Sequence, residues 1–132
     1  MSNILDLTDP QAENTPRVGG KAANLATLKR RFEGNGVVVP GGFVLTVEAH
    51  DQVMAPVKES VEHILKVDPK DHNALECLHQ SLQEALEITS LPPSLEDAIQ
   101  IHMRNRGAVA VRSSATCEDG QAAAFDQHKQ FV

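Results

Sequence analysis

The chain has 132 residues, of which 41% are apolar and 23% charged, with four Phe and neither Tyr nor Trp. This length predicts one compact domain with an aliphatic core and excludes a multidomain enzyme. Twelve basic against eighteen acidic residues give a net charge of −6, which argues against a general nucleic-acid-binding surface. No apolar run approaches membrane-spanning length, and no signal-peptide pattern opens the sequence. We therefore expect a cytoplasmic protein that contacts neither nucleic acid nor membrane.

The cysteine and histidine residues show no metal-binding spacing. Cys77 and Cys117 lie far apart, and the six His residues form no HxxxH or HExxH pair. We expect free thiols in a reducing compartment and no metal site made by these side chains.

Apolar periodicity in the first third of the chain predicts strands around one helix. Residues 4–7 predict a short strand, and residues 37–39 and 43–47 predict two further short strands or extended segments. The helix between them begins near Lys21 and ends at residues 34–36, Gly-Asn-Gly, because Gly and Asn tolerate the left-handed conformation after a helix. Its apolar positions recur at helical spacing: Ala22, Leu25, Leu28 and Phe32.

The middle of the chain is predicted to be helical. Thr46 is a possible N-cap of a helix that Pro56 interrupts, and residues 57–65 continue with an amphipathic turn or two. Asp71 is the expected N-cap of a long helix over residues 74–88. The apolar stripe of that helix consists of Leu75, Leu78, Leu82, Ala85 and Leu86.

A last helix and a strand are expected before a polar C-terminal segment. Ser94 with Asp97 three residues later resembles a capping box, which would open a helix that continues until Gly107. The apolar run Ala108–Val111 then predicts a buried strand, followed by a loop-like stretch over residues 112–130.

This mixed order of strands and helices indicates an α+β or α/β fold. We expect the α+β class, with a small mixed sheet and several packed helices in one domain over residues 1–132.

The first segment whose residues indicate a ligand-binding role is VGGKAANL, residues 18–25. Gly19 and Gly20 directly before a helix would expose backbone N–H groups to a phosphate, and Lys21 would add a positive charge. The GxxxxGK[ST] pattern of a Walker A loop is absent. The alternative interpretation is an ordinary loop-to-helix turn with a solvated lysine.

The second segment is VAVRSSATCED, residues 109–119. A buried strand that ends at Arg112 would place a bidentate donor where α/β folds bind ligands. Short hydroxyl side chains follow: Ser113, Ser114 and Thr116. The alternative interpretation is a structural salt bridge from Arg112 to Glu118 or Asp119.

Together with VPGGFVLTVEAH between them, these two segments occur in an order that resembles one family. The chain resembles the N-terminal domain of the phosphoenolpyruvate synthase and pyruvate phosphate dikinase family, whose module also occurs in rifampicin phosphotransferases and glucan, water dikinases. The resemblance covers residues 5–131, although residues 52–106 resemble the family only in kind. It implies the first half of an ATP-grasp-like fold.

The resemblance also implies a chemistry. Enzymes of this family transfer the β-phosphate of ATP to a histidine on a swivelling domain and release AMP and phosphate. Lys21 resembles the lysine that contacts the ATP phosphates, and Arg112 resembles the arginine that stabilises the transferring phosphoryl group, which makes Arg112 the candidate catalytic residue. The implied cofactor is ATP with Mg²⁺. The candidate nucleotide-binding residues are Gly19, Gly20, Lys21, Arg112, Ser113 and Ser114.

One stretch departs from the family pattern. Where relatives carry a glycine-containing loop of the ASFAGQ kind, residues 123–128 read AAFDQH, without the glycine and with Asp126 near the expected triphosphate. A like-charge contact at ~4 Å costs about 1 kcal/mol in water and more in a less polar cleft. The second ATP-grasp subdomain and the phosphohistidine domain are expected as partners outside this sequence. We therefore expect a partial ATP-binding subdomain that is not catalytically competent alone.

Two alternatives stay open. The chain could be a stand-alone, non-catalytic interaction module that kept the fold and self-associates through the face that would meet the second subdomain. It could also be an α+β domain without any ligand.

Overall fold

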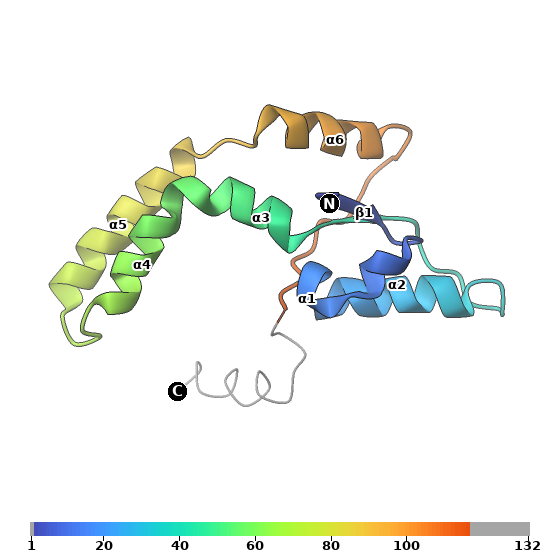
Figure 1. Ribbon diagram of the computed structural model, residues 1–132, viewed down its shortest axis with the longest axis horizontal. Helices are drawn as coiled ribbons and strands as arrows, with labels where there is room; N and C mark the ends of the chain where they lie inside the picture. Colours follow the sequence, from blue (N-terminus) through green and yellow to red (C-terminus); the bar gives the residue numbers. More distant parts are fainter. Residues whose placement is uncertain (1, 117–132) are drawn as a thin grey trace.

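The computed structural model describes residues 2–116, and Figure 1 shows an open arrangement of helices around a small sheet. The predicted α+β class is confirmed. In chain order the elements are β1 (Ile4–Asp6), η1 (Pro10–Glu13), α1 (Thr15–Val18), α2 (Gly20–Phe32), β2 (Phe43–Leu45), α3 (Val47–Met54), η2 (Ala55–Val57), α4 (Lys58–Lys66), α5 (His72–Ile88) and α6 (Pro93–Met103).

The sheet of the described residues has two strands and is antiparallel rather than mixed. In β1 and β2, Ile4 pairs with Leu45 and Asp6 pairs with Phe43. The strand expected over residues 37–39 does not form. Val37 makes only an isolated bridge, and Val38 is 89% exposed. Pro40 follows directly and lacks the N–H that would continue a ladder.

The N-terminal lobe, which we define as β1, η1, α1, α2 and β2, contains the main buried cluster. Helix α2 contributes small residues to this cluster, among them Ala22 of the predicted stripe, whereas the three large residues of that stripe lie on the outer face. Leu25, Leu28 and Phe32 are 40%, 46% and 48% exposed. Small side chains allow η1 to pack closely on α2, so the larger ones remain on the outer face. The buried residues of this cluster are Leu5, Leu7, Ala12, Val18, Ala23 and Ala26.

A second cluster joins the other face of β1 to two helices. Ile4 packs with Ala49 of α3 and Leu95 of α6, and all three are buried. Thr46 does occupy the N-cap position of α3, but its side chain makes no capping hydrogen bond.

The capping box expected at the start of α6 was wrong. The N-cap is Pro92, no side chain caps the helix, and Ser94 lies inside it. Pro93 occupies the first helical position, where the fixed φ of proline is already suited to the helix and its missing N–H has no cost.

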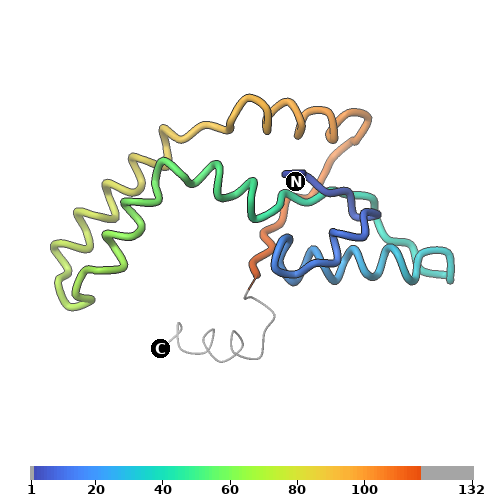
Figure 2. Tube along the Cα trace, viewed as in Figure 1, coloured from blue at the N-terminus to red at the C-terminus, as the bar shows by residue number. Residues whose placement is uncertain are grey.

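Helices α4 and α5 form what we call the helical hairpin, which extends away from the N-terminal lobe in Figures 1 and 2. Asp71 is the N-cap of α5, as predicted, and its Oδ1 accepts a hydrogen bond from the Ala74 N–H at 3.0 Å. Pro56 lies in η2, which interrupts the helical path where the sequence indicated. Neither α4 nor α5 contains a fully buried residue.

Candidate functional site

The first candidate segment forms the turn between α1 and α2. Gly19 has φ +80°, a left-handed conformation that favours glycine, and its N–H donates to the Thr15 carbonyl at 2.8 Å. Helix α2 starts at the next residue, Gly20, so Lys21 is the second residue of the helix. The sequence prediction of a glycine turn leading into a helix is therefore confirmed.

The second candidate segment is not a buried strand. Residues 108–111 pair with neither strand of the sheet, and Val111 is 92% exposed. This prediction was wrong because a strand is stabilised by hydrogen bonds to a neighbouring strand. Within the described residues, residues 108–111 have no such neighbour. Arg112 and Ser113 follow in an exposed segment that is neither helix nor strand, whereas Ser114 is half-buried.

The structure brings the two segments into direct contact. The Ala22 N–H of α2 donates to Ser114 Oγ at 3.0 Å, across 92 residues of sequence. The Gly20 N–H donates to the Ala115 carbonyl at 3.1 Å. The start of α2 and residues 113–115, which we call the SSA tripeptide, thus form one structural unit.

The two candidate cations border this contact from separate segments. Lys21 lies between the two α2 residues whose N–H groups are bonded, and Arg112 precedes Ser114 by two residues. Two residues of extended chain span at most about 7.2 Å between Cα atoms, so the backbone of Arg112 lies close to the start of α2. Both side chains are solvent-exposed.

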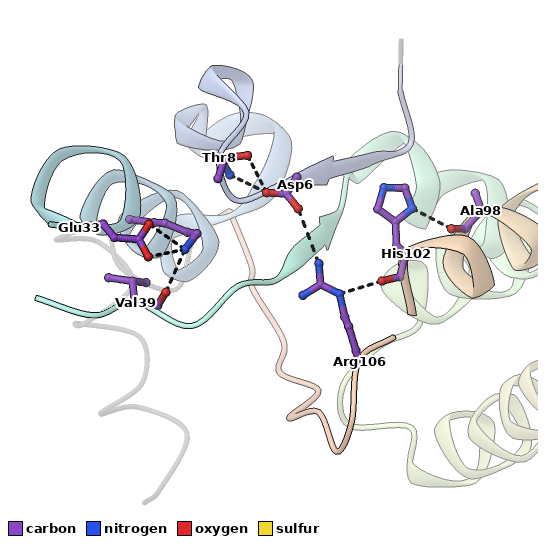
Figure 3. Close-up of polar contacts among 8 residues, drawn as sticks. Asp6, Thr8, Glu33, Val39, Ala98, His102 and Arg106 are labelled. Carbon is purple, nitrogen blue, oxygen red and sulfur yellow. Dashed lines mark hydrogen bonds and ion pairs between the residues drawn. The ribbon is translucent and has the colours of Figure 1, made fainter. Parts of the chain in front are cut away.

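A cluster that the sequence did not indicate fixes the chain just before the second segment. Arg106 Nε donates to the His102 carbonyl at 2.8 Å, and its guanidinium carbon lies 5.6 Å from the centre of the Phe43 ring. One guanidinium nitrogen lies 3.7 Å from Asp6 Oδ2, as Figure 3 shows. Arg106 therefore connects the end of α6 to both strands. The only sequence signal was a basic residue immediately before Gly107, which is too common to identify such a role.

Asp6 is held in its ionised form by this cluster. Burial, the largest single effect, raises the pKa of the Asp6 carboxyl, whereas the Thr8 N–H and hydroxyl, at 2.9 and 2.8 Å, lower it. The charges of Arg106 and Lys29 act in the same direction, so the pKa of Asp6 is lowered from its ordinary value. Lys29 itself bonds both oxygens of Glu33 and the Val39 carbonyl, which anchors the chain after α2 (Figure 3).

Three further observations bear on what the site can bind. Across residues 2–116, no group of three or more His, Cys, Asp and Glu side chains is arranged to hold a metal ion. A depression of about 240 Å³ at η2 and the end of α5 includes none of the six candidate site residues. Glu118, Asp119 and the departing stretch at residues 123–128 lie outside the described residues.

No helix within the described residues is both long and apolar enough to cross a membrane.

Comparison with known proteins identifies the family of this chain. The profile of the pyruvate phosphate dikinase AMP/ATP-binding domain matches residues 15–128. A rifampicin phosphotransferase from Streptomyces sp is 37% identical over 128 residues, which cover 92% of this chain and 14% of that protein. The phosphoenolpyruvate synthases of Escherichia coli (strain K12) and Deinococcus radiodurans are each 36% identical, covering 88% and 87% of this chain. The chain spans only 16% of either synthase. It belongs to the pyruvate phosphate dikinase AMP/ATP-binding domain family.

Proposed function

We propose that this chain is the phosphate-contacting part of an ATP-binding domain, within a phosphotransferase of the phosphoenolpyruvate synthase or pyruvate phosphate dikinase type. The observation that carries the proposal is the contact of Ser114 and Ala115 with the start of α2. It joins two segments from opposite ends of the chain, each of which supplies a cation. In this proposal residues 1–132 form one partial domain.

The proposed roles follow from the chemistry of phosphoryl transfer, which depends on positioning and on neutralising charge. Lys21 provides a compact point charge for the ATP phosphates. Arg112 provides a planar donor that can bond two oxygens of the transferring group, and it is the proposed catalytic residue. The remaining proposed nucleotide-binding residues are their neighbours in sequence: Gly19, Gly20, Ser113 and Ser114.

The proposal assigns ATP together with Mg²⁺ as the ligand. Residues 2–116 include the two proposed phosphate-binding cations, Lys21 and Arg112, but no cluster of three or more metal-ligating side chains. The proposal therefore gives Mg²⁺ no protein ligand within this range. Because the chain spans 14–16% of the relatives compared, we further propose that turnover requires a second ATP-grasp subdomain and a phosphohistidine domain outside this sequence.

Titration of the chain with ATP·Mg²⁺, followed by the amide signals in an NMR spectrum, tests the nucleotide site. We expect the amides of residues 19–22 and 112–115 to shift, with an affinity weak enough to require millimolar ligand. Lys21→Ala and Arg112→Ala should each weaken binding by about tenfold to 150-fold, because a hydrogen bond to a charged group contributes roughly 1.5–3 kcal/mol.

Lys66→Ala and Arg104→Ala are the matched controls, since they remove exposed cations of the same kinds from the end of α4 and the end of α6. The proposal is wrong if these controls weaken binding as much as the site variants do. It is equally wrong if no amide near the two segments shifts in several millimolar ATP·Mg²⁺. ATP hydrolysis by the isolated chain that disappears in Lys21→Ala and Arg112→Ala would show that the chain is competent alone.

A second function is favoured by the outer face of α2. Leu25, Leu28 and Phe32 form an exposed apolar stripe of the kind that marks association surfaces. In this alternative the chain is a non-catalytic module that self-associates through the stripe. Sedimentation velocity of the chain and of Leu28→Glu distinguishes the two: dimers that the variant dissociates, in a chain that binds no ATP, would favour the alternative.

A further inference from the structure

The N-terminus of α2 is capped by a residue from the far end of the described chain. Gly19 occupies the N-cap position and has no side chain with which to accept a hydrogen bond. Ser114 Oγ accepts the bond instead, from the N–H of Ala22, the third helical residue. A Ser or Thr at the N-cap position would normally accept from this same N–H.

The fit at Gly19 is tight for two separate reasons. Its φ of +80° is unfavourable for any residue with a Cβ. A Cβ placed there would also lie 2.3 Å from the Ser114 carbonyl oxygen and 2.4 Å from Ser114 Oγ. Only a hydrogen at this position leaves room for the backbone of residue 114, so the glycine is required by the approach of the second segment.

These contacts bear on which groups face a phosphate. The Gly20 and Ala22 N–H groups are among the donors that a helix N-terminus would offer to an anion, and both are already bonded to residues 114 and 115. A phosphate could use them only by displacing the SSA tripeptide. The side chains of Lys21 and Arg112 are exposed to solvent.

We propose that Gly19, Gly20 and Ser114 are positioning residues that hold the two segments together and fix Lys21 relative to Arg112, while these two side chains bind the phosphates. This inference rests on the proposed function for its ligand. It differs from the expectation that the glycine pair itself cradles the phosphate, because the partner of the glycine pair is another part of the protein.

Amide hydrogen exchange without nucleotide tests the contact itself. In Ser114→Ala the Ala22 N–H loses its acceptor, and we expect its exchange to accelerate about fivefold, equivalent to roughly 1 kcal/mol. The Ala23 N–H, which donates to the Gly19 carbonyl within the helix, is the internal reference and should change less. Ser114→Thr keeps the hydroxyl and should restore the slow exchange, whereas Ser113→Ala, at the exposed neighbour, should have no effect. Unchanged exchange of Ala22 in Ser114→Ala would overturn the inference.

A double-mutant cycle on ATP affinity tests the positioning role. Ser114→Ala should weaken ATP binding severalfold in the wild-type background, but much less in a Lys21→Ala background, because its effect acts through Lys21. Equal effects in both backgrounds would assign Ser114 an independent phosphate contact and overturn the positioning role. Because the exchange experiment contains no nucleotide, a chain that shows the Ala22 effect but never binds ATP would refute the proposed function separately.

Discussion

The N-terminal lobe and the helical hairpin differ in how deeply they bury their apolar side chains. The lobe consists of short elements around one longer helix, yet Leu5, Leu7, Ala12 and Val18 are buried in it. The hairpin consists of two regular helices with clear apolar stripes, yet neither contains a fully buried residue. Elements that converge from several directions enclose a core, whereas two helices side by side cover each other on one face only. A clear apolar stripe in the sequence of a helix therefore does not show that the helix contributes most to the free energy of unfolding.

The largest expected difference between the two regions comes from truncating one leucine in each. Leu5→Ala in the lobe should lower the free energy of unfolding by about 2–5 kcal/mol, because Leu5 is only 3% exposed. Leu82→Ala in the hairpin removes a half-buried side chain and should cost about 1 kcal/mol. Urea denaturation of both variants, with unchanged slope, gives the comparison. Similar losses for the two variants would mean that the hairpin contributes as much to stability as the lobe.

A smaller effect is expected at the helix starts, where three side-chain caps were predicted from sequence and only that of Asp71 makes its hydrogen bond. Asp71→Ala should destabilise α5 by about 1 kcal/mol, because the Ala74 N–H loses its acceptor. Ser94→Ala is the matched control and should change stability by less than about 0.5 kcal/mol, since Ser94 caps nothing in α6. Amide exchange should localise the Asp71 effect to the hairpin and leave α2 unchanged. A large Ser94 effect would contradict the observed start of α6.

The smallest expected effect is the contribution of Asp6 to the pH dependence of the stability of the lobe. The pKa of Asp6 is lowered in the folded protein. Ionised Asp6 therefore stabilises the fold fully at pH values above the pKa of the unfolded chain, near 3.8. That contribution is lost as the pH falls through the lower folded pKa. Asp6→Asn should therefore cost less than about 1 kcal/mol at pH 6, and the difference from wild type should vanish by about pH 2.

Thermal unfolding of wild type and Asp6→Asn between pH 2 and pH 6 measures this effect. Asp97→Asn, on the exposed face of α6, serves as the control. A constant difference between wild type and Asp6→Asn across that range would show that the ionisation of Asp6 is not responsible.

The sequence predicted those features that depend on neighbouring residues. Asp71 caps its own helix, Pro56 interrupts its own chain, and the glycines at 34 and 36 both have positive φ after α2. Each of these effects is set within a few positions, so a local pattern contains the required information.

Features that depend on distant partners were predicted poorly. The run Ala108–Val111 has strand composition, but strand formation requires a neighbour that no local pattern supplies. The stripe from Leu25 to Phe32 was recognised as apolar, although the packing of η1 and α1 decided which face of α2 became buried. At the candidate site, the residues were identified from sequence and from resemblance, but the bond from Ala22 to Ser114 was not.

The distance in sequence between Ser114 and the helix that it caps has a consequence during synthesis. Helix α2 leaves the ribosome well before its capping residue, because 92 residues separate the donor from the acceptor. At about 5–20 residues per second, that separation corresponds to roughly 5–20 s of translation. During this interval the first turn of α2 lacks its cap, and Gly19 and Gly20 leave it free to fray. The two cations acquire their final relative position only when the last part of the described chain has been made.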